Sequence, residues 1–152
     1  MIQTLIRPDG ETLAFRSVGG SGPTAVWIGG FRSDMEGTKA LALDAAARER
    51  GWNFVRYDHF AHGASSGDWR QATIGRWRED AIALIDRLEG PVIPVGSSMG
   101  GWVALLLAVV MAGFYIAGVV RLRRRGDQWP MLRTVLFVLG CVAFAWVMSG
   151  GA

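Results

Sequence analysis

The feature that most restricts how this chain can fold is a serine framed by two glycines, in the stretch Gly96-Ser97-Ser98-Met99-Gly100. A short apolar run rich in β-branched residues leads into it, and a longer apolar run of helical character follows. Strand, sharp turn and helix is the context in which a G-x-S-x-G pattern forms a nucleophile elbow. A Cβ at position 96 or 100 would clash where the backbone doubles back, which is why glycines are needed there. The pattern predicts Ser98 as a catalytic nucleophile, with a Gly/Ser-rich loop without chemistry as the alternative.

The same turn predicts how negative charge would be stabilised beside Ser98. The hydroxyl would lie at a helix N-terminus, whose dipole favours a developing negative charge. The backbone N–H of Met99 would point to the position that an oxyanion occupies during the reaction. These features favour acyl transfer through a covalent intermediate on Ser98.

Composition restricts the class of protein. A chain of 152 residues has room for one domain of ordinary size. Five of its 16 basic residues lie between positions 121 and 133, so the basic pI of about 9.7 has a local origin. Without a basic face interleaved with aromatic residues, nucleic acid is not expected as a partner. The single Cys141 excludes an intrachain disulfide, and residues 1–22 lack the apolar segment of a cleavable signal peptide.

The order of the expected elements predicts an α/β fold. Apolar runs and turn residues predict five strands, at 2–7, 12–18, 24–28 and 53–57 and in the run that ends at Gly96. Helices are expected at 34–50, capped by Ser33 or Asp34, and at 73–88. Strands that alternate with helices form a parallel sheet, and ligands bind at the carboxyl ends of its strands. The loops that leave those ends, 29–33, 58–69 and 96–101, should therefore meet at one site.

Residues 1–108 resemble the α/β-hydrolase family, in particular a subgroup of acyl-glucuronide esterases and protein depalmitoylases. Three spaced stretches carry the resemblance: Trp27-Ile28-Gly29-Gly30-Phe31-Arg32-Ser33-Asp34-Met35 with Thr38-Lys39-Ala40, Arg56-Tyr57-Asp58 with His62-Gly63-Ala64-Ser65-Ser66-Gly67, and Gly96-Ser97-Ser98-Met99-Gly100-Gly101-Trp102. The resemblance implies that Ser98 is the nucleophile and that Gly96 and Gly100 are the elbow glycines. It also implies an oxyanion hole built from the backbone N–H groups of Phe31 and Met99, without a metal or another cofactor.

The catalytic triad of such an enzyme is incomplete in this sequence. A serine needs a base and an orienting acid, which in this fold follow it in the order Asp or Glu, then His. After Ser98 the chain has one carboxylate, Asp127, and no histidine. His62 could act as a substitute base, although a loop histidine with local hydrogen bonds is the simpler interpretation. A metal site formed by Asp58, His59 and His62 lacks a further ligand nearby. Turnover is therefore expected to be close to background.

The C-terminal third has the character of a membrane segment. Two stretches, 102–120 and 134–152, contain no charged residue, and about 19 residues span roughly 28 Å as a helix, enough for a bilayer core. The arginines between them, with Trp129, fit a short cytoplasmic loop with an interfacial anchor. We expect both stretches to insert, which predicts a bacterial inner-membrane protein, or a cytoplasmic one if the tail does not insert. The competing hypothesis is a sixth strand at 114–120 of a short, diverged hydrolase.

The tail, residues 108–152, resembles a second family, the membrane assembly factors of cytochrome c oxidase. The stretch that carries this resemblance is 121–134, followed by the apolar run that contains Gly140. Cys141 and Met148 are one heptad apart and could bind copper, but apolar residues that face lipid or another helix are the favoured interpretation. The two resemblances predict a junction near Ala108, with a truncated α/β-hydrolase sheet in 1–108 and two hydrophobic helices, a membrane hairpin, in 109–152.

Three functions follow from this organisation. The first is hydrolysis of a small carboxylic ester or acyl thioester, catalytically incomplete because no histidine follows Ser98. The second is a non-catalytic membrane hairpin related to oxidase assembly. The third is a chimeric or truncated gene product without a function of its own.

Overall fold

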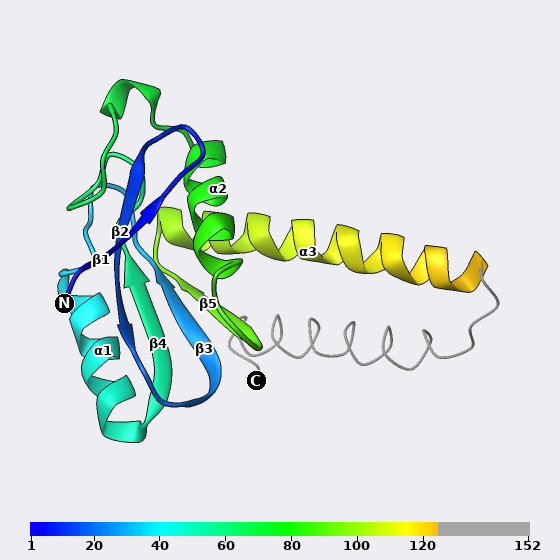
Figure 1. The fold of residues 1–152 in the computed structure, drawn as a ribbon, viewed down its shortest axis with the longest axis horizontal. Coiled ribbons are helices and arrows are strands. Elements are labelled where there is room, and N and C mark those ends of the chain that lie inside the picture. The colour runs from blue at the N-terminus through cyan, green and yellow to red at the C-terminus, as the bar shows by residue number, and fades with distance from the viewer. Residues whose placement is uncertain (125–152) are drawn as a thin grey trace, which may run out of the picture. The chain divides into compact units, whose positions relative to one another are not determined.

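The computed structural model describes residues 1–124, which form five strands, three α-helices and one short 3-10 helix (Figure 1). The chain divides between Ala108 and Val109 into two units, which are considered separately below. The second charge-free stretch, the carboxylate of Asp127 and the suggested copper ligands Cys141 and Met148 lie outside the described residues.

The strands form one mixed sheet in the order β1-β2-β4-β3-β5. Their bounds are β1 Gln3–Ile6, β2 Thr12–Val18, β3 Ser21–Ile28, β4 Trp52–Tyr57 and β5 Val92–Gly96. The expected hairpin is present, because β1 and β2 pair antiparallel around the turn at Gly10. β4, β3 and β5 are parallel, as the sequence predicts, whereas β2 joins β4 antiparallel. The carboxyl ends of β3, β4 and β5 therefore lie at one edge of the sheet.

Helices cover both faces of this sheet (Figure 1). α1 (Thr38–Arg50) packs through Ala40 and Ala47 on one face. α2 (Ile74–Ile85) and the start of α3 (Met99–Arg124) pack on the other. Alternate residues of each central strand point to opposite faces, so every second side chain joins each core. The larger core contains Val26, Ile28, Val55, Tyr57, Trp77, Ala81, Leu84, Met99, Val103 and Leu107.

The start of α1 differs from the prediction. The helix begins at Thr38 behind Gly37, which has no side-chain cap, and not behind Ser33 or Asp34. Asp34 instead accepts the N–H of Glu36 with its carboxylate and the N–H of Gly37 with its carbonyl. These short-range bonds form a turn that delays the helix, which is the known competition between Asp side chains and helical hydrogen bonds. The predicted end is correct, since Gly51 adopts the left-handed conformation after Arg50.

α3 is one continuous helix from Met99 to Arg124, so no strand forms at 114–120. The hypothesis of a short hydrolase with a sixth strand there is therefore wrong. Among the described residues, none of the helices has the combination of length and apolar character needed to cross a bilayer. The structure thus gives no support to a membrane span at 102–120, and the stretch 134–152 is outside its description.

A buried charged cluster connects α2 to the rest of the sheet. The carboxylate of Asp80 is fully buried and accepts the backbone N–H of Phe60 at 2.8 Å. It also pairs with Arg7 at 3.1 Å and with Arg76 at 3.6 Å. Burial raises the pKa of Asp80, and the Phe60 N–H and the two guanidinium groups act in the opposite direction. Asp80 thereby links α2 to the loop after β4 and to the β1–β2 hairpin.

Candidate functional site

Ser98 occupies a tight turn between β5 and α3. Its φ is +54°, in the left-handed region that non-glycine residues rarely adopt. A Cβ at Gly96 would lie 2.3 Å from the carbonyl oxygen of Gly100, and one at Gly100 would lie 2.0 Å from that of Ile28. Neither position therefore has room for a side chain. The absence of a Cβ at Gly100 also lets the first turn of α3 pack directly against the end of β3. The Ser98 side chain is at the surface, where a substrate could reach it.

The loop after β3, residues 29–34, runs beside Ser98 and is called the oxyanion loop below. A Cβ at Gly30 would lie 3.4 Å from the Cβ of Ser98, so the two backbones are in close approach. Within residues 1–124, no hydrogen bond uses the backbone N–H of Phe31 or that of Met99. Both groups therefore remain available as donors near Ser98, as an oxyanion hole requires.

A pocket of about 330 Å³ opens at Ser98. One wall is the oxyanion loop, another is the first turn of α1, and Ser97 and Ser98 complete it. Lys39, from α1, donates to the hydroxyl of Ser97 at 3.2 Å and so places a positive charge beside the elbow. No carboxylate among the described residues lies within ion-pair distance of Lys39.

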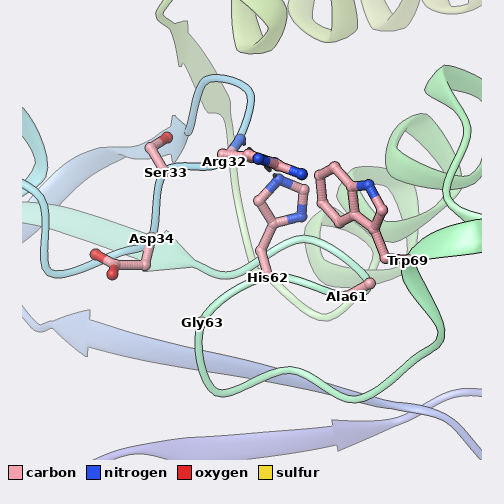
Figure 2. A pocket seen from close by; sticks show the side chains of 7 residues that line it. All are labelled: Arg32, Ser33, Asp34, Ala61, His62, Gly63 and Trp69. Atoms are coloured by element: carbon pink, nitrogen blue, oxygen red, sulfur yellow. Dashed lines mark hydrogen bonds between the residues drawn. The ribbon is translucent and has the colours of Figure 1, made fainter.

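A second pocket, of about 270 Å³, is lined by the oxyanion loop and by the loop after β4 (Figure 2). Arg32, His62 and Trp69 point toward one another there, and the carboxylate of Asp34 points away from them. The guanidinium of Arg32 lies 5.4 Å from the centre of the Trp69 ring, within the range of a cation–π contact. Ser33 and Asp34 line both pockets, which are therefore adjacent.

Backbone strain is concentrated at these pockets. Within residues 1–124, three non-glycine residues have a positive φ: Arg32 at +54°, Ala61 at +59° and Ser98 at +54°. Each of them lines one of the two pockets. Such conformations persist only where the surrounding structure holds them, and they cluster at functional sites. The three loops expected to meet at the carboxyl edge of the sheet do meet there.

Both histidines are engaged in structural contacts. Nε2 of His59 lies 3.3 Å from the carbonyl oxygen of Gly29, and its burial lowers the pKa of His59 to about 4. His62 is also buried, with Nδ1 3.0 Å from the carbonyl oxygen of Phe60. Its Nε2 accepts the backbone N–H of Arg32 at 3.2 Å. The expected local hydrogen bond is thus present at Nδ1 of His62. Nε2, in contrast, binds a residue 30 positions earlier in the chain.

Asp58 connects the same loops through both of its carboxylate oxygens. One carboxylate oxygen accepts the N–H of Met35 at 2.6 Å and the other accepts that of Ala64 at 2.8 Å. A Cβ at Gly63 would collide with this carboxylate, at 2.1 Å. Burial raises the pKa of Asp58, and the two backbone N–H donors oppose that shift. The carboxylate therefore fastens the loop after β4 to the loop after β3.

Three pocket residues were missed in the prediction of the site from sequence. Lys39 and Arg32 stand inside the stretches that carry the α/β-hydrolase resemblance, and their basic character beside a glycine-rich loop was an available signal. Trp69 has no such signal, because a tryptophan in a loop is as typical of packing as of binding. It is placed by the short 3-10 helix Trp69–Gln71, which Asp68 caps.

Known proteins resemble the two parts of the chain separately. The mitochondrial palmitoyl-protein thioesterase ABHD10 of Bos taurus is 41% identical over 109 residues, which are 71% of this chain and 36% of that protein. The human protein of the same name is 42% identical over 106 residues, or 69% of this chain and 35% of the relative. The chain thus spans about a third of the length of these relatives.

Solved structures show the same likeness in the fold. The α/β-hydrolase domain-containing protein 10 from mouse superposes with a TM-score of 0.70 at 36% identity, covering 72% of this chain and 44% of that one. A putative hydrolase from Agrobacterium vitis superposes with a TM-score of 0.64 at 43% identity, covering 70% and 44%. A family model described as cytochrome c oxidase caa3 assembly factor matches residues 113–152. The N-terminal part of the chain therefore resembles the α/β-hydrolase family in sequence and has an α/β-hydrolase-like fold, and the tail resembles the caa3 assembly factors.

Proposed function

We propose that this chain carries the acyl-transfer half of an ester or thioester hydrolase site, with Ser98 as nucleophile. The observation that carries the proposal is the turn itself. Ser98 is held at a positive φ between β5 and α3, beside two backbone N–H groups, of Phe31 and Met99, without partners among the described residues. In the reaction, the Ser98 oxygen would attack the carbonyl carbon of the substrate and lose its proton to water. The two N–H groups would stabilise the resulting oxyanion. The tetrahedral intermediate would then break its bond to the leaving alcohol or thiol, which takes up a proton, and an acyl group would remain on Ser98.

The proposed site has no base within the described residues. Each histidine is bonded to a backbone group, His59 to Gly29 and His62 to Arg32 and Phe60, and neither contacts Ser98. Removal of the base from a serine triad lowers kcat by several orders of magnitude and leaves the contribution of the oxyanion hole. We therefore expect slow acylation of Ser98 and almost no turnover.

The substrate class is a carboxylic ester or an acyl thioester. The named activity of the ABHD10 relatives is thioester hydrolysis, and a thioesterase domain from the curacin biosynthetic pathway superposes with a TM-score of 0.63 at 26% identity. An elbow with an oxyanion hole serves both substrates, because each passes through the same tetrahedral oxyanion. The exposed position of Ser98 and the pocket of about 330 Å³ beside it suit a small acyl group.

The proposal is tested by the mass of the intact chain after incubation with p-nitrophenyl butyrate. We expect one butyryl group per chain, located on Ser98 by peptide mapping, and no group in Ser98→Ala. Ser17→Ala is the matched control, since Ser17 is an exposed serine on β2, and it should acylate like the wild type. Equal labelling of Ser98→Ala and the wild type would contradict the proposal. Rapid turnover that is lost in Ser98→Ala, in His62→Ala and also in His62→Gln, which keeps a hydrogen-bond acceptor but is not a base, would show that His62 has become the base.

We further propose that residues 109–152 attach the chain to a membrane, as a hairpin related to oxidase assembly. The match of residues 113–152 to the caa3 assembly factors and the absence of charge from 134–152 support this second function. The full chain should then stay with the membrane fraction after a carbonate wash at high pH. Deletion of 109–152 should release the remaining part. Recovery of the full chain in the soluble fraction would rule out insertion of the tail.

A further inference from the structure

The oxyanion loop contains a turn whose conformation is unfavourable for its sequence. The N–H of Ser33 donates to the carbonyl oxygen of Gly30 at 3.2 Å, which closes a β-turn with Phe31 and Arg32 at its centre. Arg32 has a φ of +54°, and Phe31 is not among the residues of positive φ. This order of φ signs matches a type II turn, which places glycine at the second central position. Here that position holds an arginine, so the turn needs support from outside.

His62 supplies that support. Its Nε2 accepts the N–H of Arg32 at 3.2 Å, and that N–H belongs to the peptide between Phe31 and Arg32. Types I and II of a β-turn differ by a flip of this peptide. Because Nε2 accepts, the imidazole must be neutral and must donate from Nδ1, which lies 3.0 Å from the carbonyl oxygen of Phe60. Both ring nitrogens thus have a defined role, and the bond to Arg32 selects one of the two turn types.

The packing around His62 keeps its ring in place. The side chain is buried, and its ring centre lies 4.9 Å from that of Trp69 and 5.4 Å from that of Trp77. His59 lies 5.7 Å away on the same loop. In Figure 2 the His62 ring stands between the oxyanion loop and Trp69, and the dashed line joins it to the backbone of Arg32. The packed ring therefore presents Nε2 as a hydrogen-bond acceptor in a fixed position beside the turn.

We propose that His62 is a positioning residue that keeps the oxyanion loop in its active form. By accepting the N–H of Arg32, it holds the Phe31–Arg32 peptide in one orientation and so fixes the turn that follows the N–H of Phe31, which belongs to the preceding peptide. This inference rests on the proposed function for the meaning of that N–H. Loss of the acceptor allows Arg32 to return to a negative φ with a peptide flip, and the loop that carries the N–H of Phe31 is then no longer held in one conformation.

Three variants separate this role from general packing. His62→Gln keeps an acceptor near the position of Nε2, whereas His62→Asn keeps a donor toward Phe60 and loses the acceptor. In the double variant, His62→Asn is combined with Arg32→Gly, which makes a positive φ free of strain. We expect His62→Asn to slow Ser98 acylation by up to about 100-fold, the limit set by complete loss of one oxyanion donor. His62→Gln should keep most of the rate, and the double variant should recover most of the loss.

A spectroscopic measurement tests the hydrogen bond without any activity. In the ¹⁵N-labelled full chain we expect a through-bond coupling between the backbone nitrogen of Arg32 and Nε2 of His62, and its absence would overturn the proposal. The proposal is also overturned if His62→Asn acylates like the wild type, or if Arg32→Gly fails to restore the rate of a folded His62→Asn chain.

If even the wild type does not acylate at Ser98, the proposed function fails, and amide hydrogen exchange then decides the role of His62. Faster exchange of the Arg32 amide in His62→Asn, with little change in His62→Gln, supports the proposal. Unchanged exchange overturns it. Should His62→Asn not fold, a double variant that folds supports the role of the turn, and one that also fails to fold shows a packing role instead.

Discussion

Replacement of Gly100 by alanine is expected to prevent the normal folding of the N-terminal part of the chain. The new Cβ would lie 2.0 Å from the carbonyl oxygen of Ile28 and 2.5 Å from that of Gly29. Both are backbone atoms at the end of β3, so neither can move aside as a flexible side chain would. The start of α3 must then separate from the sheet, and with it Met99, Val103 and Leu107 leave the larger core. Withdrawal of two or three such side chains costs about 5 kcal/mol, comparable to the whole stability of a small domain.

Gly101 provides the matched control for this prediction. It is the next residue of the same helix, and a Cβ built on it meets nothing within 4 Å. Gly101→Ala should leave stability unchanged or raise it by up to about 1 kcal/mol through helix propensity. The two variants are compared by urea unfolding of the full chain, followed by tryptophan fluorescence. Equal midpoints for Gly100→Ala and Gly101→Ala would show that the close approach of α3 to β3 is not required.

Asp80→Asn is expected to have the second largest effect, a loss of about 3 kcal/mol in the free energy of unfolding. Asparagine has the same shape and can still accept the N–H of Phe60, so the change removes chiefly the charge. Arg7, which is 9% exposed and lies 3.1 Å from the Asp80 carboxylate, then keeps a buried positive charge with a weaker partner, Glu79 at 3.9 Å. Removal of the Asp80 charge also relieves its own desolvation. That relief is substantial, because burial raises the pKa of Asp80. The expected loss therefore requires that the uncompensated charge left on Arg7 by breaking the buried pair outweighs it.

Glu79→Gln tests whether charge alone accounts for the effect of Asp80. Glu79 precedes Asp80 on α2, and its side chain is 53% exposed. Its pair with Arg7 is largely screened by solvent, so the substitution should change the free energy of unfolding by less than about 1 kcal/mol. Urea midpoints at neutral pH give both values. A loss for Glu79→Gln as large as that for Asp80→Asn would mean that burial of the Asp80 cluster is not what stabilises α2.

The arrangement of strands, helices and elbow was determined by local sequence. Apolar runs of β-branched residues, glycine stops and the helical period of 74–85 each act over a few residues, so strands and helices form close to where these patterns predict. Gly96 and Gly100 are also a local signal of this kind, because a turn that doubles back excludes Cβ atoms wherever it occurs. The largest boundary error, at the start of α1, arose where the Asp34 side chain competed with the helix for backbone groups. Smaller errors are the start of β3 at Ser21 instead of Thr24 and the end of α2 at Ile85 instead of Leu88.

Tertiary structure alone decided how the loops hold one another. Nothing near His62 in the sequence indicates that its Nε2 supports Arg32, 30 residues earlier, or that Asp58 fastens Met35 to Ala64. These bonds depend on the parallel sheet, which brings the ends of β3 and β4 together and buries the polar groups between them. A buried polar group must find a partner, and the identity of that partner is set by which chain segments meet, not by the residues beside it. The sequence by itself therefore determined the tight turn at Ser98, and only the fold decided which residues the loops after β3 and β4 use to bind one another.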